Sequence, residues 1–136
     1  MKGPVTPYLT FYGQAREAAE FYSRVFGMEI VELNTYGDSN FPTPPNADDL
    51  IIHGHLKKGQ MEFMMADSSE NKTLMSQNGI SLVIECESGE EAEQFYNGLT
   101  EDGTVLMELQ DTFWGAKYGK VRDKYGFVWD LNYVKE

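Results

Sequence analysis

The feature that most constrains the fold is a short motif that occurs twice in the chain. Residues 17–22 read EAAEFY and residues 91–96 read EAEQFY, which gives the pattern EAxxFY at an offset of 74 residues. Each copy has helical spacing, follows a strand-like segment and is followed by a glycine, Gly27 or Gly103. A repeat of this length predicts two copies of one supersecondary unit, and we expect the copies to enclose a shared cleft.

Hydrophobic periodicity extends each copy into a strand–helix–strand–strand–strand unit. The first unit has a predicted helix at residues 14–26 and predicted strands at 8–12, 28–36, 50–57 and 60–66. In the second unit Ser88 and Glu91 form a capping box that begins a helix carrying the second EAxxFY motif. The predicted strands of this unit are residues 80–85, 104–109, 113–122 and 127–133.

The length of 136 residues predicts one domain with a core of its own. We expect a single domain over residues 1–136, with module one at about 5–67, a linker at 68–78 and module two at about 79–134. The predicted fold class is α+β, with two tandem βαβββ modules forming a cleft-lined mixed sheet.

The net charge of −11 argues against partners that are themselves anionic. Nucleic-acid phosphates and anionic membrane surfaces both require a basic footprint. No apolar run is long enough to span a membrane and no signal-peptide pattern opens the chain, so we expect a cytoplasmic protein. The single cysteine, Cys86, excludes an intramolecular disulfide and a CxxC metal site, and we expect it to be a small buried residue.

Several segments resemble the vicinal oxygen chelate superfamily, which includes glyoxalase I, extradiol dioxygenases and bleomycin resistance proteins. The doubled βαβββ pattern, the EAxxFY helices and the DxxGxxW turn at residues 123–129 carry this resemblance. Residues 7–11 (PYLTF) and 113–129 (FWGAKYGKVRDKYGFVW) make the chain similar to the PhnB-like branch. The resemblance covers essentially the whole chain and implies the glyoxalase/bleomycin resistance fold and a homodimer.

The resemblance also implies four metal-ligand positions, on the first and last strands of each module. They fall on Pro7, Met64, Ser81 and Asp130. Proline has no donor atom, and methionine and serine are poor ligands for a hard divalent ion, so Asp130 alone would suit one. We therefore expect no metal at these positions and no cofactor.

A substitute site is conceivable on the predicted hairpin at residues 50–66. If residues 58–59 form a two-residue loop, His55 pairs with Glu62 and His53 pairs with Met64. Side chains alternate along a strand, so all four would share one face. Two interpretations remain open: a functional one, with a displaced metal site or a His55–Glu62 acid–base pair, and a polar cross-strand pair lining a wet cleft.

The closing strand places its residues on opposite faces of the sheet. Side chains alternate along a strand, so if Asp130 faces the cleft, Trp129 faces the helix and Asn132 faces the cleft. Trp114 is a candidate for lining a pocket. Glycines at 115 and 119 can introduce bulges, so Tyr118 is left unassigned between the two faces.

The sequence thus predicts a PhnB-like protein, without metal, that binds a small organic ligand. The competing hypothesis is a metal-dependent enzyme of the glyoxalase or dioxygenase kind with a relocated metal. A link to phosphonate metabolism rests on the branch name alone, and the sequence lacks the glycine-rich cofactor loop after a strand that methyl transfer would need. The predicted ligand-binding residues are Pro7, His53, His55, Glu62, Met64, Ser81, Trp114, Asp130 and Asn132.

Overall fold

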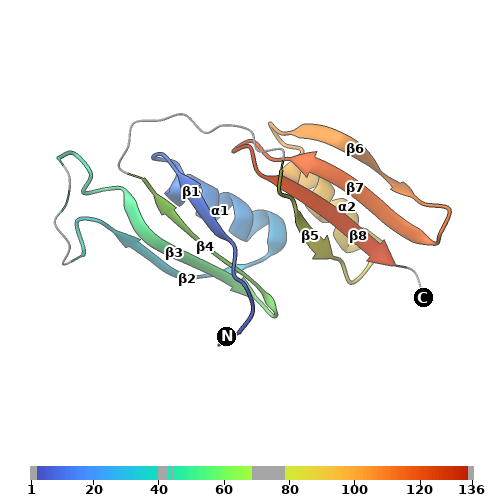
Figure 1. The fold of residues 1–136 in the computed structure, drawn as a ribbon, viewed down its shortest axis with the longest axis horizontal. Coiled ribbons are helices and arrows are strands. Elements are labelled where there is room, and N and C mark those ends of the chain that lie inside the picture. The colour runs from blue at the N-terminus through green and yellow to red at the C-terminus, as the bar shows by residue number, and fades with distance from the viewer. Residues whose placement is uncertain (1–2, 40–42, 44, 69–78, 135–136) are drawn as a thin grey trace. The chain divides into compact units, whose positions relative to one another are not determined.

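The computed structural model describes residues 3–39, 43, 45–68 and 79–134. The chain divides into two compact units, Met1–Thr73 and Leu74–Glu136. Each unit contains one helix and one four-stranded mixed sheet, which confirms the α+β fold of two βαβββ modules (Figure 1). The predicted linker at 68–78 lies, apart from Ser68, outside the described residues, and a single domain over the whole chain stays a prediction.

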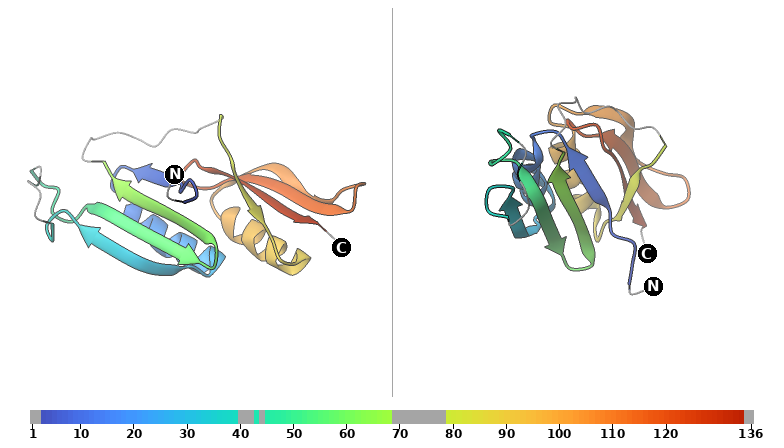
Figure 2. Two further views of the ribbon diagram at one scale, coloured as in Figure 1. Left: turned by 60° about the horizontal axis from the view of Figure 1, so that its bottom comes forward. Right: turned by 60° about the vertical axis from the view of Figure 1, so that its left-hand side comes forward.

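The two sheets have the same topology. The first unit contains β1 (Tyr8–Phe11), α1 (Ala15–Phe26), β2 (Glu29–Thr35), β3 (Ile51–Lys58) and β4 (Met61–Asp67), with strand order β1-β4-β3-β2. The second unit contains β5 (Leu82–Glu85), α2 (Gly89–Leu99), β6 (Thr104–Asp111), β7 (Ala116–Arg122) and β8 (Val128–Val134), with order β5-β8-β7-β6. The first strand of each unit runs parallel to the last, and the other pairs are antiparallel. Each helix lies on one face of its own sheet (Figure 2).

The helix α1 forms because its apolar residues recur at helical spacing. Ala15, Ala18, Tyr22 and Phe26 are fully buried. Gly27 ends the helix in the left-handed conformation, at φ 69°. This confirms the stop that the sequence predicts.

A buried carboxylate from β4 holds the start of α1. Asp67 Oδ1 accepts hydrogen bonds from the backbone N–H groups of Gly13 (2.8 Å) and Ala15 (3.0 Å). Asp67 Oδ2 accepts a third from the backbone N–H of Ile51 (3.0 Å). Asp67 lies one residue beyond the predicted strand 60–66; it belongs to the last strand of the first sheet and joins three segments of the unit.

The helix α2 begins with the predicted capping box. Ser88 Oγ accepts a hydrogen bond from the backbone N–H of Glu91, and Glu91 Oε1 accepts one from the backbone N–H of Glu87. Ala92 and Leu99 are buried on the inner face of the helix. No helix among the described residues is long and apolar enough to cross a membrane.

Trp129 lies in the core of the second unit, as the strand alternation predicts. It is almost fully buried, and its indole Nε1–H donates to Asp123 Oδ2 at 2.8 Å. Asp123 Oδ1 also accepts from the backbone N–H groups of Tyr125 and Phe127. The carboxylate thus links the turn at residues 123–126 to the core tryptophan.

The predicted register of the β3–β4 hairpin is wrong by two residues. Lys58 pairs with Met61, so residues 59 and 60 form the loop, and His55 faces Met64 instead of Glu62. The reason is that Gly59, at φ +58°, takes the first loop position while Lys58 extends the strand. Lys58 Nζ there donates to the carbonyl of Phe26 at 2.8 Å. A shift of two residues preserves the face of every side chain.

Candidate functional site

Each sheet has one face packed against its helix and a second face that we call its open face. In the first unit, Leu9, Leu56 and Phe63 are buried and point toward α1. The alternating residues of the same strands form the first open face. Its polar and pliable members are Tyr8, Glu32, His53, His55, Glu62 and Met64.

The two histidines lie on this open face, and each contacts a glutamate. His55 Nε2 lies 2.7 Å from Glu62 Oε2, a hydrogen bond between diagonal neighbours on β3 and β4. His53 Nε2 lies 3.5 Å from Glu32 Oε2 on β2, and its Nδ1 lies 3.5 Å from the Tyr8 hydroxyl. The predicted shared face of the histidines and Glu62 is therefore present, although the pairing differs.

Metal coordination by these side chains would need at least three converging ligands. In the part of the chain that the structure describes, no group of three or more His, Cys, Asp or Glu side chains is placed to hold an ion. His55 and Glu62 instead bind each other. This arrangement can pass a proton between imidazole and carboxylate.

Two of the four positions implied by the resemblance lie side by side in the first unit. The carbonyl of Pro7 accepts a hydrogen bond from the backbone N–H of Met64 at 2.9 Å. Ser81 stands just before β5 and Asp130 lies within β8, both in the second unit. That all four residues surround one cavity stays a prediction.

The open face of the second sheet carries a cluster of polar side chains around Asp130. The Tyr118 hydroxyl donates to Asp130 Oδ1, and Lys120 Nζ lies 3.6 Å from the same oxygen. Asn132 Nδ2 donates to Glu85 Oε2 at 3.0 Å. Asp130 is only 4% exposed. The structure therefore assigns Tyr118, which the sequence leaves unassigned, to the same face as Asp130 and Asn132.

The protonation state of Tyr118 follows from this environment. Burial, and then the hydrogen bond to Asp130 and the charge of that carboxylate, raise the pKa of Tyr118 to about 12. On the first open face, burial and the neighbouring Tyr36 also raise the pKa of Tyr8. Both hydroxyls are therefore protonated donors at neutral pH.

Adding 74 to the residue numbers of β1 gives the bounds of β5, but matching residues of the two strands point to different faces of their sheets. Tyr8–Phe11 maps onto Leu82–Glu85. Tyr8 lies on the open face opposite Met64, whereas Leu82 lies opposite Trp129, which points toward the helix. Residues of β1 and β5 that share a face are therefore matched only when the offset is changed by one residue.

Trp114 lies in the turn before β7, outside the strand that the sequence predicts there. It is 62% exposed and packs edge-to-face on Phe113, with ring centroids 4.9 Å apart. Phe113, its ring partner, is not one of the predicted site residues. A role of Trp114 in ligand binding stays a prediction.

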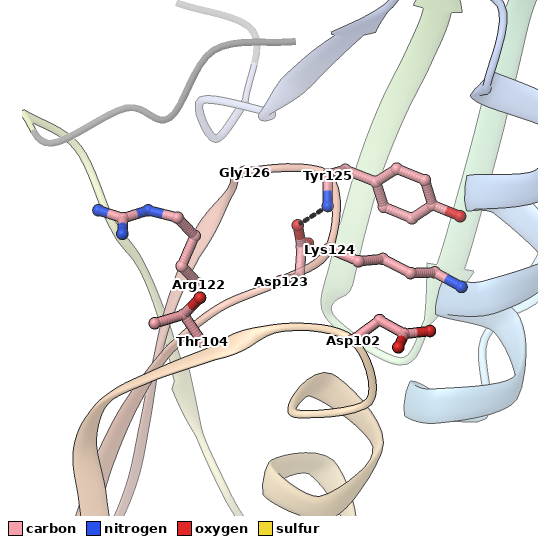
Figure 3. A pocket seen from close by; sticks show the side chains of 7 residues that line it. All are labelled: Asp102, Thr104, Arg122, Asp123, Lys124, Tyr125 and Gly126. Carbon is pink, nitrogen blue, oxygen red and sulfur yellow. Dashed lines mark hydrogen bonds between the residues drawn. The ribbon is translucent and has the colours of Figure 1, made fainter.

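A hollow of about 230 Å³ lies at the turn between β7 and β8 (Figure 3). It is lined by Asp102, Thr104, Arg122, Asp123, Lys124, Tyr125 and Gly126. None of the predicted site residues is among these. There Asp123 Oδ1 accepts a hydrogen bond from the backbone N–H of Tyr125. The side chains of Arg122 and Lys124 point to opposite sides of the turn. This hollow therefore reflects the shape of a structural turn.

The sequence did not reveal several residues of the two open faces, among them Tyr8, Glu32, Glu85 and Lys120. Tyr8 could have been found from the alternation with Leu9 and Phe11, both of which are buried. Glu32 could not, because β2 contains an irregularity between Ile30 and Glu32.

The family model described as 3-demethylubiquinone-9 3-methyltransferase matches residues 4–132. The chain belongs to this family. A putative 3-demethylubiquinone-9 3-methyltransferase, PhnB protein, from Bacillus cereus is 34% identical, with a TM-score of 0.80, and the match covers 97% of this chain and all of that one. Protein PA1353 from Pseudomonas aeruginosa is 32% identical, with a TM-score of 0.87, covering 99% of this chain and all of that one.

A more distant structure shows the wider superfamily at the level of the fold. A glyoxylase/bleomycin resistance protein/dioxygenase domain from Frankia sp. EAN1pec has a TM-score of 0.71 at 12% identity, and the match covers 99% of each chain. The family match and the Bacillus cereus relative confirm the PhnB-like resemblance, and the Frankia structure shows the glyoxalase/bleomycin resistance fold.

Proposed function

We propose that this PhnB-like protein binds a small organic ligand, without a metal, through the open faces of its two sheets. The observation that carries the proposal is Asp130, a buried carboxylate on a sheet face, surrounded by a tyrosine hydroxyl and an ammonium group. A few convergent polar groups beside apolar walls are typical of small-molecule sites. On the first open face His55, Glu62 and Met64 supply the same combination.

The metal-free part of the proposal rests on the chemistry of the residues. Pro7 has no donor atom, and Met64 and Ser81 are poor ligands for a hard divalent ion. The hydrogen bond between His55 and Glu62 engages two of the side chains that a relocated metal would need. Affinity then comes from apolar contact and a few hydrogen bonds.

One observation favours the second candidate, an enzyme of the glyoxalase or dioxygenase kind. His53 and His55 are two residues apart on one strand and share an open face. Elemental analysis of protein purified without chelator or affinity tag separates the candidates. We expect substoichiometric transition metal; one metal per chain, lost in the double variant His53→Ala/His55→Ala, would replace the proposal by the enzyme.

The names of the family model and of the Bacillus cereus relative mention methyl transfer. The proposal excludes this chemistry here, because no glycine-rich loop follows a strand in the sequence.

The proposal also includes a cytoplasmic homodimer that binds neither nucleic acid nor membranes. The net charge of −11 supports the last two points.

The direct test is a titration of the full-length, isotope-labelled chain with a library of small neutral and anionic organic compounds, followed by NMR. We expect saturable shifts of backbone amides on β3, β4, β7 and β8. His55→Ala should leave the unfolding midpoint nearly unchanged and weaken binding, whereas Gln94→Ala on the exposed side of α2 should do neither. Shifts confined to the helices, or none, would refute the proposal.

A further inference from the structure

We propose that Lys120 and Asp130 form a paired donor and acceptor that binds the edge of a carboxamide or lactam group. The Lys120 ammonium donates to the ligand's carbonyl oxygen, and Asp130 accepts the adjacent N–H. This inference deepens the proposed function and rests on it.

Asp130 has a side-chain oxygen that no described residue uses as an acceptor. Both of its contacts, with Tyr118 and Lys120, are made by Oδ1. Its Oδ2 accepts no hydrogen bond from any residue that the structure describes, although the residue is 4% exposed. Oδ2 is absent from the buried unsatisfied side-chain atoms of the described residues, so it is reached by solvent. A carboxylate oxygen can accept more than one hydrogen bond, and Oδ2 is therefore accessible to a donor of a ligand.

Lys120 has unused donors next to that acceptor. Its Nζ lies 3.6 Å from Asp130 Oδ1, which is an ion pair longer than a hydrogen bond. An ammonium group carries three N–H donors and no acceptor. The side chain is 35% exposed, so these donors are accessible. Lys120 and Asp130 are direct cross-strand partners on β7 and β8, which holds the donor and the acceptor side by side.

The charge of the pair selects a neutral ligand. Lys120 and Asp130 neutralise each other, and the chain as a whole carries −11. A carboxylate placed on Lys120 would meet the Asp130 carboxylate as a like charge. A carboxamide or lactam presents a carbonyl oxygen and an N–H on adjacent atoms and carries no charge, so it satisfies both groups without repulsion.

Tyr118 is a positioning residue in this arrangement. Its hydroxyl donates to Asp130 Oδ1 and so leaves Oδ2 for the ligand. Burial and Asp130 raise the pKa of Tyr118, which keeps this donor protonated. Tyr118→Phe should therefore weaken ligand binding at neutral pH without removing either group that contacts the ligand.

The test compares 2-pyrrolidone with N-methyl-2-pyrrolidone, which lacks the N–H, on the full-length labelled chain. We expect 2-pyrrolidone to shift the amides of Lys120 and Asp130 saturably, with roughly millimolar affinity because so small a ligand gains little binding free energy. N-Methyl-2-pyrrolidone should bind at least about tenfold more weakly, the factor that one lost hydrogen bond to a charged group gives. Equal binding of the two compounds would overturn the proposal.

Variants assign the effect to the pair. Lys120→Met should weaken 2-pyrrolidone binding by about tenfold or more. Lys117→Met is the matched control, because Lys117 lies on the same strand and binds Glu93 of α2 on the opposite face. Asp130→Asn provides a second variant, with urea unfolding as the check on its fold. Equal losses in the two lysine variants, or an unchanged affinity of Asp130→Asn, would contradict the assignment.

Two further outcomes separate the inference from the proposed function. Acetate binding more tightly than 2-pyrrolidone at the same amides would overturn the amide assignment in favour of an anion. If 2-pyrrolidone fails while other library compounds shift amides of either open face, the inference is wrong and the proposed function stands. If no compound shifts either face, both are wrong.

Discussion

Two buried carboxylates, Asp67 and Asp123, hold the backbone of the two units in the same way. Each accepts hydrogen bonds from two or more backbone N–H groups. Such bonds to a charged acceptor are stronger than neutral ones, and their loss leaves buried donors unpaired. These acids are therefore structural, unlike Asp130.

Asp67→Ala should lower the free energy of unfolding by about 3 kcal/mol or more, because three backbone N–H groups lose their acceptor. Asp67→Asn retains one acceptor oxygen and should lose less. Urea unfolding followed by circular dichroism measures both, with the exposed Asp49→Asn as control. A loss in Asp67→Ala no larger than in the control would remove Asp67 as the anchor of α1.

Tyr118 should ionise at a higher pH than a tyrosine in free solution. Its pKa is raised from 10.0 to about 12, first by burial and then by Asp130. Because the folded-state pKa is above the unfolded one, the stabilisation from neutral Tyr118 is complete below pH 10 and is lost as the pH rises through about 12. In an ultraviolet titration, Tyr118→Phe should lose one tyrosine's share of the absorbance rise near pH 12. An unchanged rise near that pH in the variant would contradict the assignment.

The two helices carry the same motif, yet the connections that follow them differ. Gly27 ends α1 with a positive φ, whereas Gly103, after α2, is confined by its neighbours. A Cβ atom at Gly103 would lie 2.5 Å from the carbonyl oxygen of Leu99 and 2.7 Å from that of Arg122. Both obstacles are backbone atoms, so neither can move without shifting α2 or β7.

Gly103→Ala should therefore destabilise the chain by about 1–3 kcal/mol, the usual cost of overpacking. Gly79→Ala is the matched control, because a Cβ atom there would meet no atom of the described residues within 4 Å. Chemical denaturation of both variants measures the difference. Similar midpoints for the two would show that the segment after α2 relaxes freely.

At the level of elements, local patterns predict most of the fold. The EAxxFY repeat predicts both helices, Ser88 and Glu91 predict the cap of α2, and alternation predicts the burial of Trp129. The register of the β3–β4 hairpin could not be predicted from the local sequence. The position of Gly59 within the loop depends on Lys58, whose ammonium group binds the carbonyl of Phe26 at the end of α1.

The candidate site is predictable only in part for a similar reason. The shared face of His53, His55 and Glu62 follows from strand alternation, which survives a register shift of two residues. The contact of Lys120 with Asp130 depends on which residues of β7 and β8 lie opposite each other. No local sequence pattern determines the register of β7 and β8, which are separated by the five residues 123–127.

At the scale of the whole molecule, the notable element is β6, an edge strand of the second sheet. It lies at the end of its sheet, and α2 packs against β7 and β8. Val105, Leu106 and Met107 are all exposed on it. An exposed apolar edge strand invites pairing with another chain. We therefore expect β6 to lie in the interface of the proposed homodimer.

Light scattering coupled to size exclusion should therefore give a mass of twice the 15.5 kDa chain. Met107→Lys should shift the mass toward one chain, because the pairing of two copies would bury two added charges in the interface. Val31→Lys is the control: Val31 is 45% exposed, Met107 is 44% exposed, and β2 is the corresponding edge strand of the first sheet. A monomeric parent chain would exclude the dimer, and dissociation by Val31→Lys alone would move the interface to β2.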